Sequence, residues 1–517
     1  MTLHLPAWLA AGKAAVALRL TAAAASGALA NVAFEVPAAN WFLLVALAVL
    51  FLLAVAPGSK KEGFALGWAW GLAFFAIGLR WCYDSMHVYG LLPAPVAAAG
   101  VILLGAVLAL FPAVVVLVSR AVPVLRRVKL MALLPAAWTA AELLRGLEPF
   151  GFGWLSAGYA YSADFFGAWA PLIGVYGVGL AAALTVGWAL ELLFPAPDKK
   201  PLAKTIDAIA LGALVLGTLA LGDVRWSQND AKLQVRLVQP DLPITMRHDP
   251  QAALLRLERA MTMSGRSGMG AGTDMIVWPE STVAGVLTDG KGVGALAALE
   301  SARKTGATVI FNAFYREAPG RYYNGLWRAD GEADAAVLFY RKHHLVPFGE
   351  FVPTGFRWFV DALGIPMADQ LRGPVGGEPF EVAGIGAAAG ICYENMFGEE
   401  LRHAWDKANP SFVINTANLG WFGEAVNGQF AAMSAMRARE TARPVLQAVQ
   451  NSGSALIGSD GRVQRLAGVG PQNLDLTLVS AKGEPTPFVR LGHWPVTALV
   501  LMLLAACGLG ARTRRRA

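Results

Sequence analysis

Long apolar runs alternate with short polar loops over the first 222 residues of the chain. A run needs roughly 17–25 residues to cross about 30 Å of hydrocarbon. Seven runs approach or exceed that length, at 14–33, 41–57, 64–83, 91–119, 130–146, 165–194 and 205–222. An eighth extends from Trp494 to about Gly510. The pattern predicts a multi-span α-helical membrane domain with about eight transmembrane helices.

The segment between the seventh and eighth runs has a different pattern. Short apolar stretches bounded by Pro, Gly or Asn predict strands at 233–238, 275–278, 308–312, 335–340, 387–391, 411–415 and 445–449. Between them, apolar residues recur at intervals of three and four, which predicts helices at 250–264, 291–305, 397–407 and 427–441. Such alternation is typical of a layered α/β domain.

The two patterns together predict the domain organisation. We expect a membrane domain at 1–222 with about seven transmembrane helices and an α/β domain at 223–490. The remaining residues, 491–517, supply the last transmembrane helix and a basic tail.

The composition supports this division. Of the 517 residues, 56% are hydrophobic and only 15% are charged, whereas soluble domains carry about 25% charged residues. The three cysteines, Cys82, Cys392 and Cys507, cannot form an even disulfide framework. These values exclude a disordered chain, a collagen-like fibre and a wholly soluble enzyme.

The basic residues predict the orientation in the membrane. With the N-terminus in the cytoplasm, the short outer loops carry only Arg80 and Arg145. The inner side then carries fourteen basic residues: Lys13, Lys60, Lys61, Arg120, Arg126, Arg127, Lys129, Lys199, Lys200, Lys204, Arg512, Arg514, Arg515 and Arg516. By the positive-inside rule, both termini are cytoplasmic and residues 223–490 lie on the outer face. The basic tail therefore indicates topology, and we expect no nucleic-acid partner.

Residues 223–490 contain one cysteine, Cys392, directly after a predicted strand. One interpretation is a small buried hydrophobic residue. The other is a nucleophile, because polar residues follow it and α/β folds place ligand sites at strand ends. A thiol has an ordinary pKa near 8.5, and only the thiolate attacks well. A nucleophilic Cys392 therefore needs a base or a cation nearby.

Histidine is the usual partner of such a thiol, and this segment offers His248, His343, His344 and His403. Adjacent residues on a strand point to opposite faces, so at most one of His343 and His344 could face a site. No set of ligands with metal-site spacing surrounds them. We expect neither a metal nor a cofactor.

Two carboxylates and a lysine lie at the ends of other predicted strands. Glu280 stands in Trp-Pro-Glu-Ser, Lys342 follows an apolar strand, and Glu350 lies in a turn that contains Pro and Gly. Taken singly, each is typical of a solvated strand end. Glu280, Lys342 and Cys392 together have a defined chemistry. A desolvated carboxylate removes the thiol proton, an ammonium stabilises the thiolate and then an oxyanion, and the thiol accepts an acyl group.

Four motifs then carry a resemblance to a known family. They are WPES at 278–281, YRKHHLVPFGEFVP at 340–353, GICYENMF at 390–397 and NTANLGWFG at 415–423. In this order they resemble the carbon–nitrogen hydrolase (nitrilase) superfamily, which has an αββα sandwich and a Glu–Lys–Cys triad. With the eight runs, the whole chain resembles its membrane branch, the apolipoprotein N-acyltransferases.

The resemblance implies a role for each matched residue. Glu280 would be the general base, Lys342 the oxyanion cation and Cys392 the nucleophile. Glu350, Tyr393 and Glu394 would support them, and the backbone N–H of Tyr393 would be the second oxyanion donor. Possible substrate-gate residues are Trp421, His248 and Asn324, of which Asn324 lies in Arg-Tyr-Tyr-Asn-Gly.

The chain departs from the family pattern at two places. The family usually has a Lys-Trp pair where this chain has Arg247-His248, and Asn-Asp-Ala where it has Asn418-Leu-Gly. Both departures affect the expected acyl-chain or headgroup preference and leave the triad intact.

The resemblance implies the last step of bacterial lipoprotein maturation. An acyl chain would pass from a membrane phospholipid, through a cysteine thioester, to the N-terminal α-amine of a diacylglyceryl-cysteine apolipoprotein by a ping-pong route. The site would face the periplasm from the cytoplasmic (inner) membrane. One alternative is a membrane-tethered amidase or nitrilase acting on a small amide. The other is a transporter, for which Arg19, Glu142, Arg145 and Glu191 are the few ionisable candidates near the spans.

Overall fold

The computed structural model describes residues 13–36, 38–147, 151–195, 200–242, 250–265, 272–358 and 369–516. The chain forms two compact units. One consists of Met1–Val224 and Leu491–Ala517, and the other of Arg225–Arg490. We describe each unit by itself.

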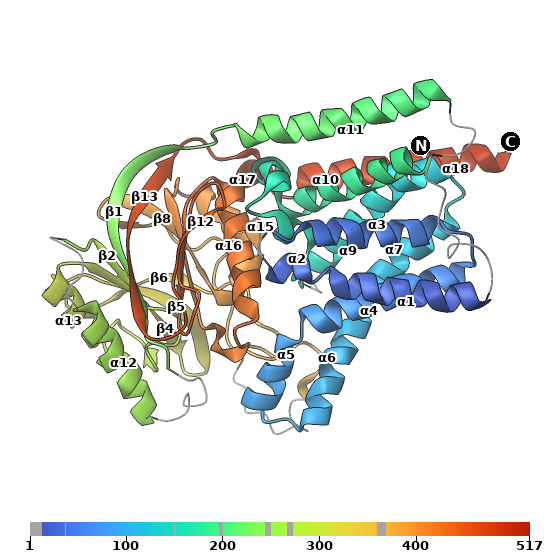
Figure 1. Cartoon of the computed structure of the whole chain (residues 1–517). Coiled ribbons are helices and arrows are strands. Elements are labelled where there is room, and N and C mark those ends of the chain that lie inside the picture. The colour runs from blue at the N-terminus through green and yellow to red at the C-terminus, as the bar shows by residue number, and fades with distance from the viewer. Residues whose placement is uncertain are drawn as a thin grey trace. The chain divides into compact units, whose positions relative to one another are not determined.

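The first unit is helical (Figure 1), and α1, α3, α4 and α7 run beside one another in it. π-Helical turns occupy Ser85–Tyr89 and Lys129–Leu133, and 3-10 turns occupy Ala157–Tyr161 and Phe165–Trp169. Its α-helices are α1 (Lys13–Leu29), α2 (Val32–Glu35), α3 (Trp41–Val55), α4 (Lys60–Gly78), α5 (Trp81–Asp84), α6 (Ala94–Leu108), α7 (Leu110–Ala121), α8 (Arg126–Val128), α9 (Leu134–Gly146), α10 (Ala170–Leu193), α11 (Pro201–Gly222) and α18 (Trp494–Arg516).

Five helical segments of the described residues are long and apolar enough to cross a membrane, and a sixth counts if the bent pair Lys60–Gly78 and Trp81–Tyr89 is one span. The chain is thus a multi-span membrane protein. The predicted run at 41–57 forms a helix of 15 residues, or about 22 Å at 1.5 Å per residue. The run at 130–146 is divided between a π turn and α9. Neither qualifies by itself, so the count of eight stays a prediction.

Several buried charges in this unit form ion pairs. Arg19 Nη1 lies 2.7 Å from Glu62 Oε1, and Arg120 Nη1 lies 3.4 Å from Glu62 Oε2. Arg126 contacts Glu191 at 3.1 Å. Charged groups inside a membrane are costly unless they are paired. These pairs satisfy Arg19 and Glu191 within the helical packing and offer no support for the transporter alternative.

The second unit contains two sheets. The first has the order β13-β1-β2-β4-β5-β6, with β3 paired to β4, and the second has the order β12-β11-β10-β9-β8-β7. The strands are β1 (Gln228–Gln239), β2 (Met275–Val277), β3 (Val286–Leu287), β4 (Thr308–Ala318), β5 (Arg321–Ala329), β6 (Val337–Arg341), β7 (Phe380–Val382), β8 (Ile385–Ile391), β9 (Phe412–Ala417), β10 (Val445–Val449), β11 (Ala455–Ile457), β12 (Val463–Leu466) and β13 (Gln472–Lys482).

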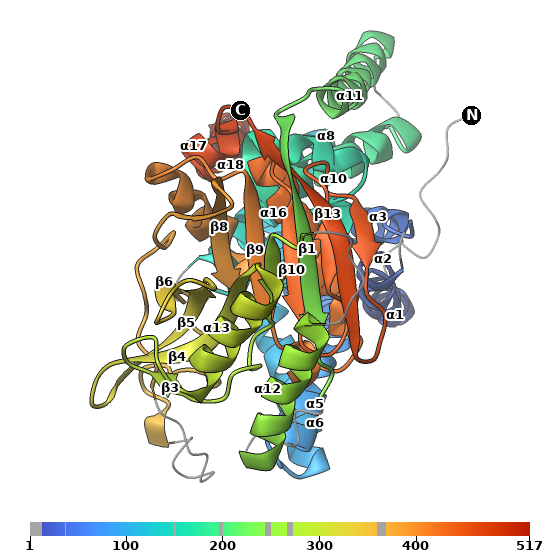
Figure 2. The same cartoon turned by 90° about the vertical axis from the view of Figure 1, so that its left-hand side faces the viewer.

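Helices cover the outer faces of the two sheets. The helices α12 (Pro250–Ser264) and α13 (Val293–Thr305) pack on the first sheet, in front of it in Figure 2. The helix α16 (Val426–Thr441) packs on β10 and β11 of the second. Alternating side chains of the strands and one stripe of each helix form the two cores. The layers are therefore α, β, β and α. A further helix, α17 (Pro487–Leu491), follows the last strand.

All seven predicted strands and three of the four predicted helices are confirmed. The helix predicted at 397–407 is instead divided into α15 (Gly398–Leu401) and a 3-10 turn at Arg402–Asp406. The longest strands that the pattern missed are β5 and β13. Asn324-Gly325 in β5 reads as a turn signal, but both residues lie in the middle of a strand because β4 and β6 flank it on either side.

Candidate active site

The three residues of the expected triad each follow the carboxyl end of a strand. Glu280 comes three residues after β2, Lys342 directly after β6, and Cys392 directly after β8. The first two strands belong to one sheet and β8 to the other. The site therefore depends on both sheets, and the loops that follow their strands supply its reactive groups.

Glu280 is bound by two donors. Its Oε1 accepts a hydrogen bond from Asn324 Nδ2 at 3.0 Å, and its Oε2 accepts one from the backbone N–H of Asn418 at 3.0 Å. Burial raises the pKa of the carboxyl, the nearby ammonium of Lys342 lowers it, and the net direction is upward. Glu280 is therefore a stronger base than an exposed glutamate.

Lys342 is almost completely buried, with 1% of its surface exposed. Its Nζ donates to Glu350 Oε1 at 2.8 Å. Burial lowers the pKa of this ammonium, but the carboxylates of Glu350 and Glu280 together raise it above its ordinary value. Lys342 is therefore a permanent cation at this site.

Cys392 begins a 3-10 turn, Cys392–Met396, which we call the Cys392 turn. The residue is buried and has a φ of 53°, which is uncommon for a residue other than glycine. Burial and then the charge of Glu280 raise the pKa of its thiol well above the usual range, and Lys342 opposes them. At neutral pH the resting group is a thiol, so its reaction requires a base.

Asn324 links the two carboxylates. Its Nδ2 lies 3.0 Å from Glu280 Oε1 and 3.3 Å from Glu350 Oε1. The side chain is 4% exposed. Asn312, which the sequence pattern missed, in turn donates to Asn324 Oδ1 at 2.5 Å and accepts a hydrogen bond from the backbone N–H of Ser281 at 3.3 Å. Asn312 thereby directs the Asn324 amide at the carboxylates. Its place at the end of a predicted strand was the only signal for it.

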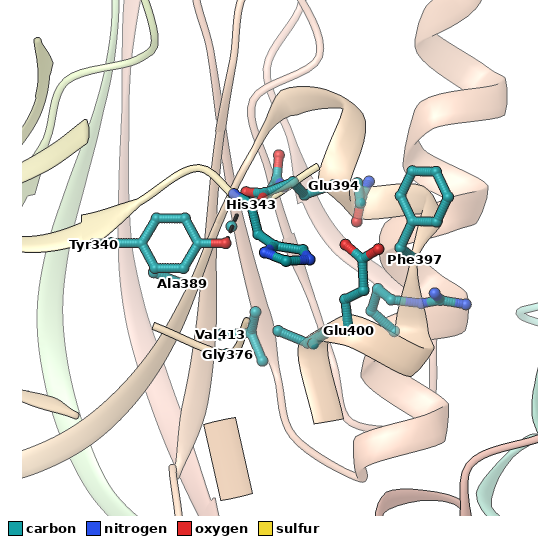
Figure 3. A pocket seen from close by; sticks show the side chains of 13 residues that line it. Tyr340, His343, Gly376, Ala389, Glu394, Phe397, Glu400 and Val413 are labelled. Atoms are coloured by element: carbon teal, nitrogen blue, oxygen red, sulfur yellow. Dashed lines mark hydrogen bonds between the residues drawn. The ribbon is translucent and has the colours of Figure 1, made fainter. Parts of the chain in front are cut away.

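Glu394, which Figure 3 draws together with Tyr340 and His343, joins the Cys392 turn to the segment that follows Lys342. Its Oε2 accepts hydrogen bonds from Tyr340 Oη and from the backbone N–H of Ile391, both at 2.8 Å. Its Oε1 accepts hydrogen bonds from the backbone N–H groups of His343 at 2.6 Å and His344 at 3.0 Å. With four donors, this carboxylate fixes the distance between two loops and has no free position for a proton-transfer role.

The remaining candidates occupy different positions. Trp421 lies in a 3-10 turn, Leu419–Trp421, directly after Asn418. Tyr393 lies in the Cys392 turn, with its ring 5.4 Å from that of Phe397. His248 lies outside the described residues.

The described parts of the chain contain no group of three or more His, Cys, Asp or Glu side chains that could hold a metal ion.

Two family models match the chain in the same order as its two units. Residues 26–188 match the apolipoprotein N-acyltransferase N-terminal domain, and residues 234–481 match carbon-nitrogen hydrolase. The apolipoprotein N-acyltransferase of Ralstonia nicotianae is 35% identical over 95% of this chain and 93% of its own length. The chain belongs to the apolipoprotein N-acyltransferase family.

Other members of the family match over similar lengths. The apolipoprotein N-acyltransferase of Bordetella bronchiseptica is 34% identical and covers 96% of this chain, with 97% of its own length aligned. A carbon–nitrogen hydrolase superfamily protein from Xanthomonas campestris, of known crystal structure, is 18% identical over 48% of this chain and 91% of that chain, with a TM-score of 0.36. The family membership confirms the resemblance that the four motifs indicate.

Asn324 gives a prediction for this family member. Replacement by leucine is expected to raise the pKa of Glu280 further, because the carboxylate loses a donor in a buried site. A hydrogen bond to a charged group contributes about 1.5–3 kcal/mol, so acylation of Cys392 at neutral pH should slow by roughly 10–100-fold. The pH dependence of acylation, followed by mass spectrometry, should shift to higher pH.

Asn473→Leu is the matched control. Asn473 donates to the backbone carbonyl of Met263 at 2.8 Å and lies on β13, outside the network around Glu280. Its loss should leave the pH dependence unchanged. An unchanged profile in Asn324→Leu itself would contradict the link between this amide and the carboxylate of Glu280.

Proposed function

We propose that this apolipoprotein N-acyltransferase moves an acyl chain from a membrane phospholipid onto Cys392 and then onto the N-terminal α-amine of a diacylglyceryl-cysteine apolipoprotein. The observation that carries the proposal is the connected set Glu280–Asn324–Glu350–Lys342, whose charges act on the Cys392 thiol. The match to the family over nearly the whole chain supports this choice of acyl donor and acceptor.

The first half of the reaction forms a thioester. Glu280 takes the proton of the Cys392 thiol, and the thiolate attacks the ester carbonyl of the phospholipid. Lys342 and the backbone N–H of Tyr393 stabilise the oxyanion. The carbon–oxygen bond then breaks, and Glu280 returns the proton to the departing alkoxide, which leaves as a lysophospholipid.

The second half transfers the acyl chain to the amine. The neutral α-amine of the apolipoprotein attacks the thioester carbonyl, and the same two donors stabilise the oxyanion. The carbon–sulfur bond breaks, and the proton lost by the attacking nitrogen passes through Glu280 to the thiolate of Cys392. The thioester is already activated, so the sequence of steps uses no cofactor.

The other candidates have supporting roles in this proposal. Glu350 holds Lys342 and Asn324 in place through one carboxylate oxygen. Glu394 fixes the Cys392 turn, and Asn324 positions Glu280 and is not a gate. Trp421 and His248 remain the proposed gate residues for the substrates.

A small amide is a weaker substrate candidate. The same triad serves amidases, so the chemistry by itself does not distinguish the two functions. The match over 95% of the chain to an apolipoprotein N-acyltransferase, with the membrane unit included, favours acyl transfer.

An intact-mass experiment tests the proposal. The purified full chain is incubated with phosphatidylethanolamine vesicles, and the mass should increase by one acyl group. Hydroxylamine at neutral pH should remove that group, because it cleaves thioesters. The absence of any labile adduct, with ammonia release from a small amide instead, would favour the amidase.

The proposal includes a topology with eight spans, both termini in the cytoplasm and residues 223–490 on the periplasmic side of the inner membrane. Its basis is the distribution of basic residues between short loops.

A reporter active only outside the cytoplasm should be active when fused after Asp230 and silent when fused after Arg516. The control is the same pair of fusions with a reporter active only in the cytoplasm, which should give the opposite pattern. If the reporter that is active only outside the cytoplasm were active when fused after Arg516, the orientation would be the opposite of the proposed one.

A further inference from the structure

A buried histidine next to Lys342 contacts the segment that follows the nucleophile. His344 is 4% exposed. Its ring stacks on Phe397 with 3.5 Å between centroids and 18° between planes, and lies 5.6 Å from the ring of Tyr393. Its Nδ1 lies 2.7 Å from Glu400 Oε1. One side chain, two residues from Lys342, therefore contacts three residues that follow Cys392.

We propose that His344 is a positioning residue for the oxyanion site. Through Phe397 and Glu400 it holds the backbone of Tyr393 at a fixed distance from Lys342, so that both donors meet the same oxygen. The inference rests on the proposed function of this site.

The Cys392 turn needs such support. Cys392 has a positive φ, and residues in sparsely populated conformations persist only where surrounding contacts hold them. On one side, Asn395 Nδ2 donates to Ser434 Oγ at 2.8 Å and to the Phe430 carbonyl at 3.2 Å, which fixes the turn to α16. On the other side lies the segment after Lys342, whose contacts with the turn are made by Glu394 and by the His344 ring. The segment after Lys342 contributes the backbone N–H groups of His343 and His344, which bind Glu394, and the His344 ring.

A small pocket lies beside these contacts, and Tyr340, His343, Glu394, Phe397 and Glu400 are among the residues that line it (Figure 3). Phe397 and Glu400 are also the residues that the His344 ring contacts. The stack and the hydrogen bond therefore hold this wall of the pocket against the segment that follows Lys342.

The two contacts can be separated by substitution. His344→Leu removes the donor to Glu400 and retains an apolar side chain beside Phe397. His344→Asn places an amide nitrogen close to the position of Nδ1 and keeps the hydrogen bond. Glu400→Ala breaks the same bond from a residue whose side chain is 25% exposed, and it serves if His344→Leu does not accumulate. His403→Leu is the control, since His403 forms an exposed pair with Asp406 at 2.6 Å.

Two reactions of Cys392 distinguish positioning from a general structural role. Acylation by phospholipid passes through an oxyanion, whereas alkylation by iodoacetamide displaces iodide and does not. Both rates are measured on the full chain in a background with Cys82→Ser and Cys507→Ser, so that only Cys392 reacts.

His344→Leu should acylate about 10–100-fold more slowly, because a misplaced oxyanion donor loses part of the 10²–10³-fold that such a donor contributes. Its alkylation rate should stay within about twofold of the parent. His344→Asn should recover part of the acylation rate, and His403→Leu should match the parent.

Three outcomes would overturn the inference. They are an unchanged acylation rate in His344→Leu or Glu400→Ala, equal losses of acylation and alkylation, and no difference between the Leu and Asn variants. A parent protein that forms no acyl adduct would instead refute the proposed function, so the two failures are distinct.

Discussion

Replacement of Cys392 by serine should abolish acyl transfer and the acyl adduct, with a loss of more than about 10³-fold, as is usual when a nucleophile is removed. The site already disfavours the anion, because burial raises the pKa of the thiol well above its usual range. A serine hydroxyl is far less acidic than a thiol, so Glu280 could not ionise it. The measurements are acyl transfer to a lipopeptide amine and intact mass after incubation with phospholipid.

The fold should tolerate this change, since oxygen for sulfur is nearly isosteric. Cys82→Ser and Cys507→Ser are the matched controls, because both residues lie in the membrane unit. Their activity should equal that of the parent. If Cys392→Ser retained more than a small fraction of the transfer rate, another residue would have to carry the acyl group.

The strand ends that carry the proposed triad could be predicted from the sequence, because each of its three members follows a short apolar strand. Strand periodicity is local, and the strand before Glu280, the strand before Lys342 and the strand before Cys392 were all predicted within two residues. Since strand ends are the usual place for ligand sites in α/β folds, polar residues there could be recognised as a set.

Contacts between segments could not be predicted in the same way. β5 carries Asn324, but its Asn-Gly pair resembles a turn, and only pairing with β4 and β6 makes it a strand. Asn312 and Asn418 act on the site through bonds to residues 12 or more positions away. Nothing in the local pattern distinguishes them from ordinary buried or loop asparagines.

The adjacent histidines show a second limit. The strand pattern predicts that His343 and His344 point to opposite faces, so that at most one could face a site. In the structure β6 ends at Arg341, and both lie in the segment after it. His343 Nδ1 lies 2.7 Å from the carbonyl of Gly373, and His344 Nδ1 lies 2.7 Å from Glu400. The backbone N–H groups of both bind Glu394, a function that side-chain patterns do not reveal.

The number of spans cannot be predicted from composition alone, because it also depends on the geometry of each helix. The run at 41–57 is apolar throughout, but its helix α3 has only 15 residues. The run at 130–146 includes Glu142 and Arg145, and both are buried. Arg145 donates to the Trp154 carbonyl at 2.5 Å, and Glu142 accepts a hydrogen bond from the backbone N–H of Ala157 at 2.7 Å. A hydropathy profile identifies such a segment by the length of its apolar run. It does not detect these hydrogen bonds to the following loop.

Glu280→Gln should slow acylation of Cys392 by roughly 10²–10⁴-fold, which is the usual contribution of a general base. Glutamine keeps the size of the side chain and an oxygen for the backbone N–H of Asn418, but it cannot accept the thiol proton. The thermal unfolding midpoint of the variant is measured alongside, because the amide offers one oxygen for the two donors Asn324 and Asn418. The measurement is single-turnover acylation by phospholipid, with Glu300→Gln on the exposed face of α13 as the control.

The pH dependence of acylation identifies the general base more directly than the size of the rate loss does. In the parent, acylation should rise with pH through the raised pKa of Glu280, because only the carboxylate accepts the proton. In Glu280→Gln this rise should disappear, and the residual rate should increase only in the alkaline range, where the Cys392 thiol ionises by itself. A variant that acylates at a near-normal rate, or that keeps the parent's pH midpoint, would exclude Glu280 as the base.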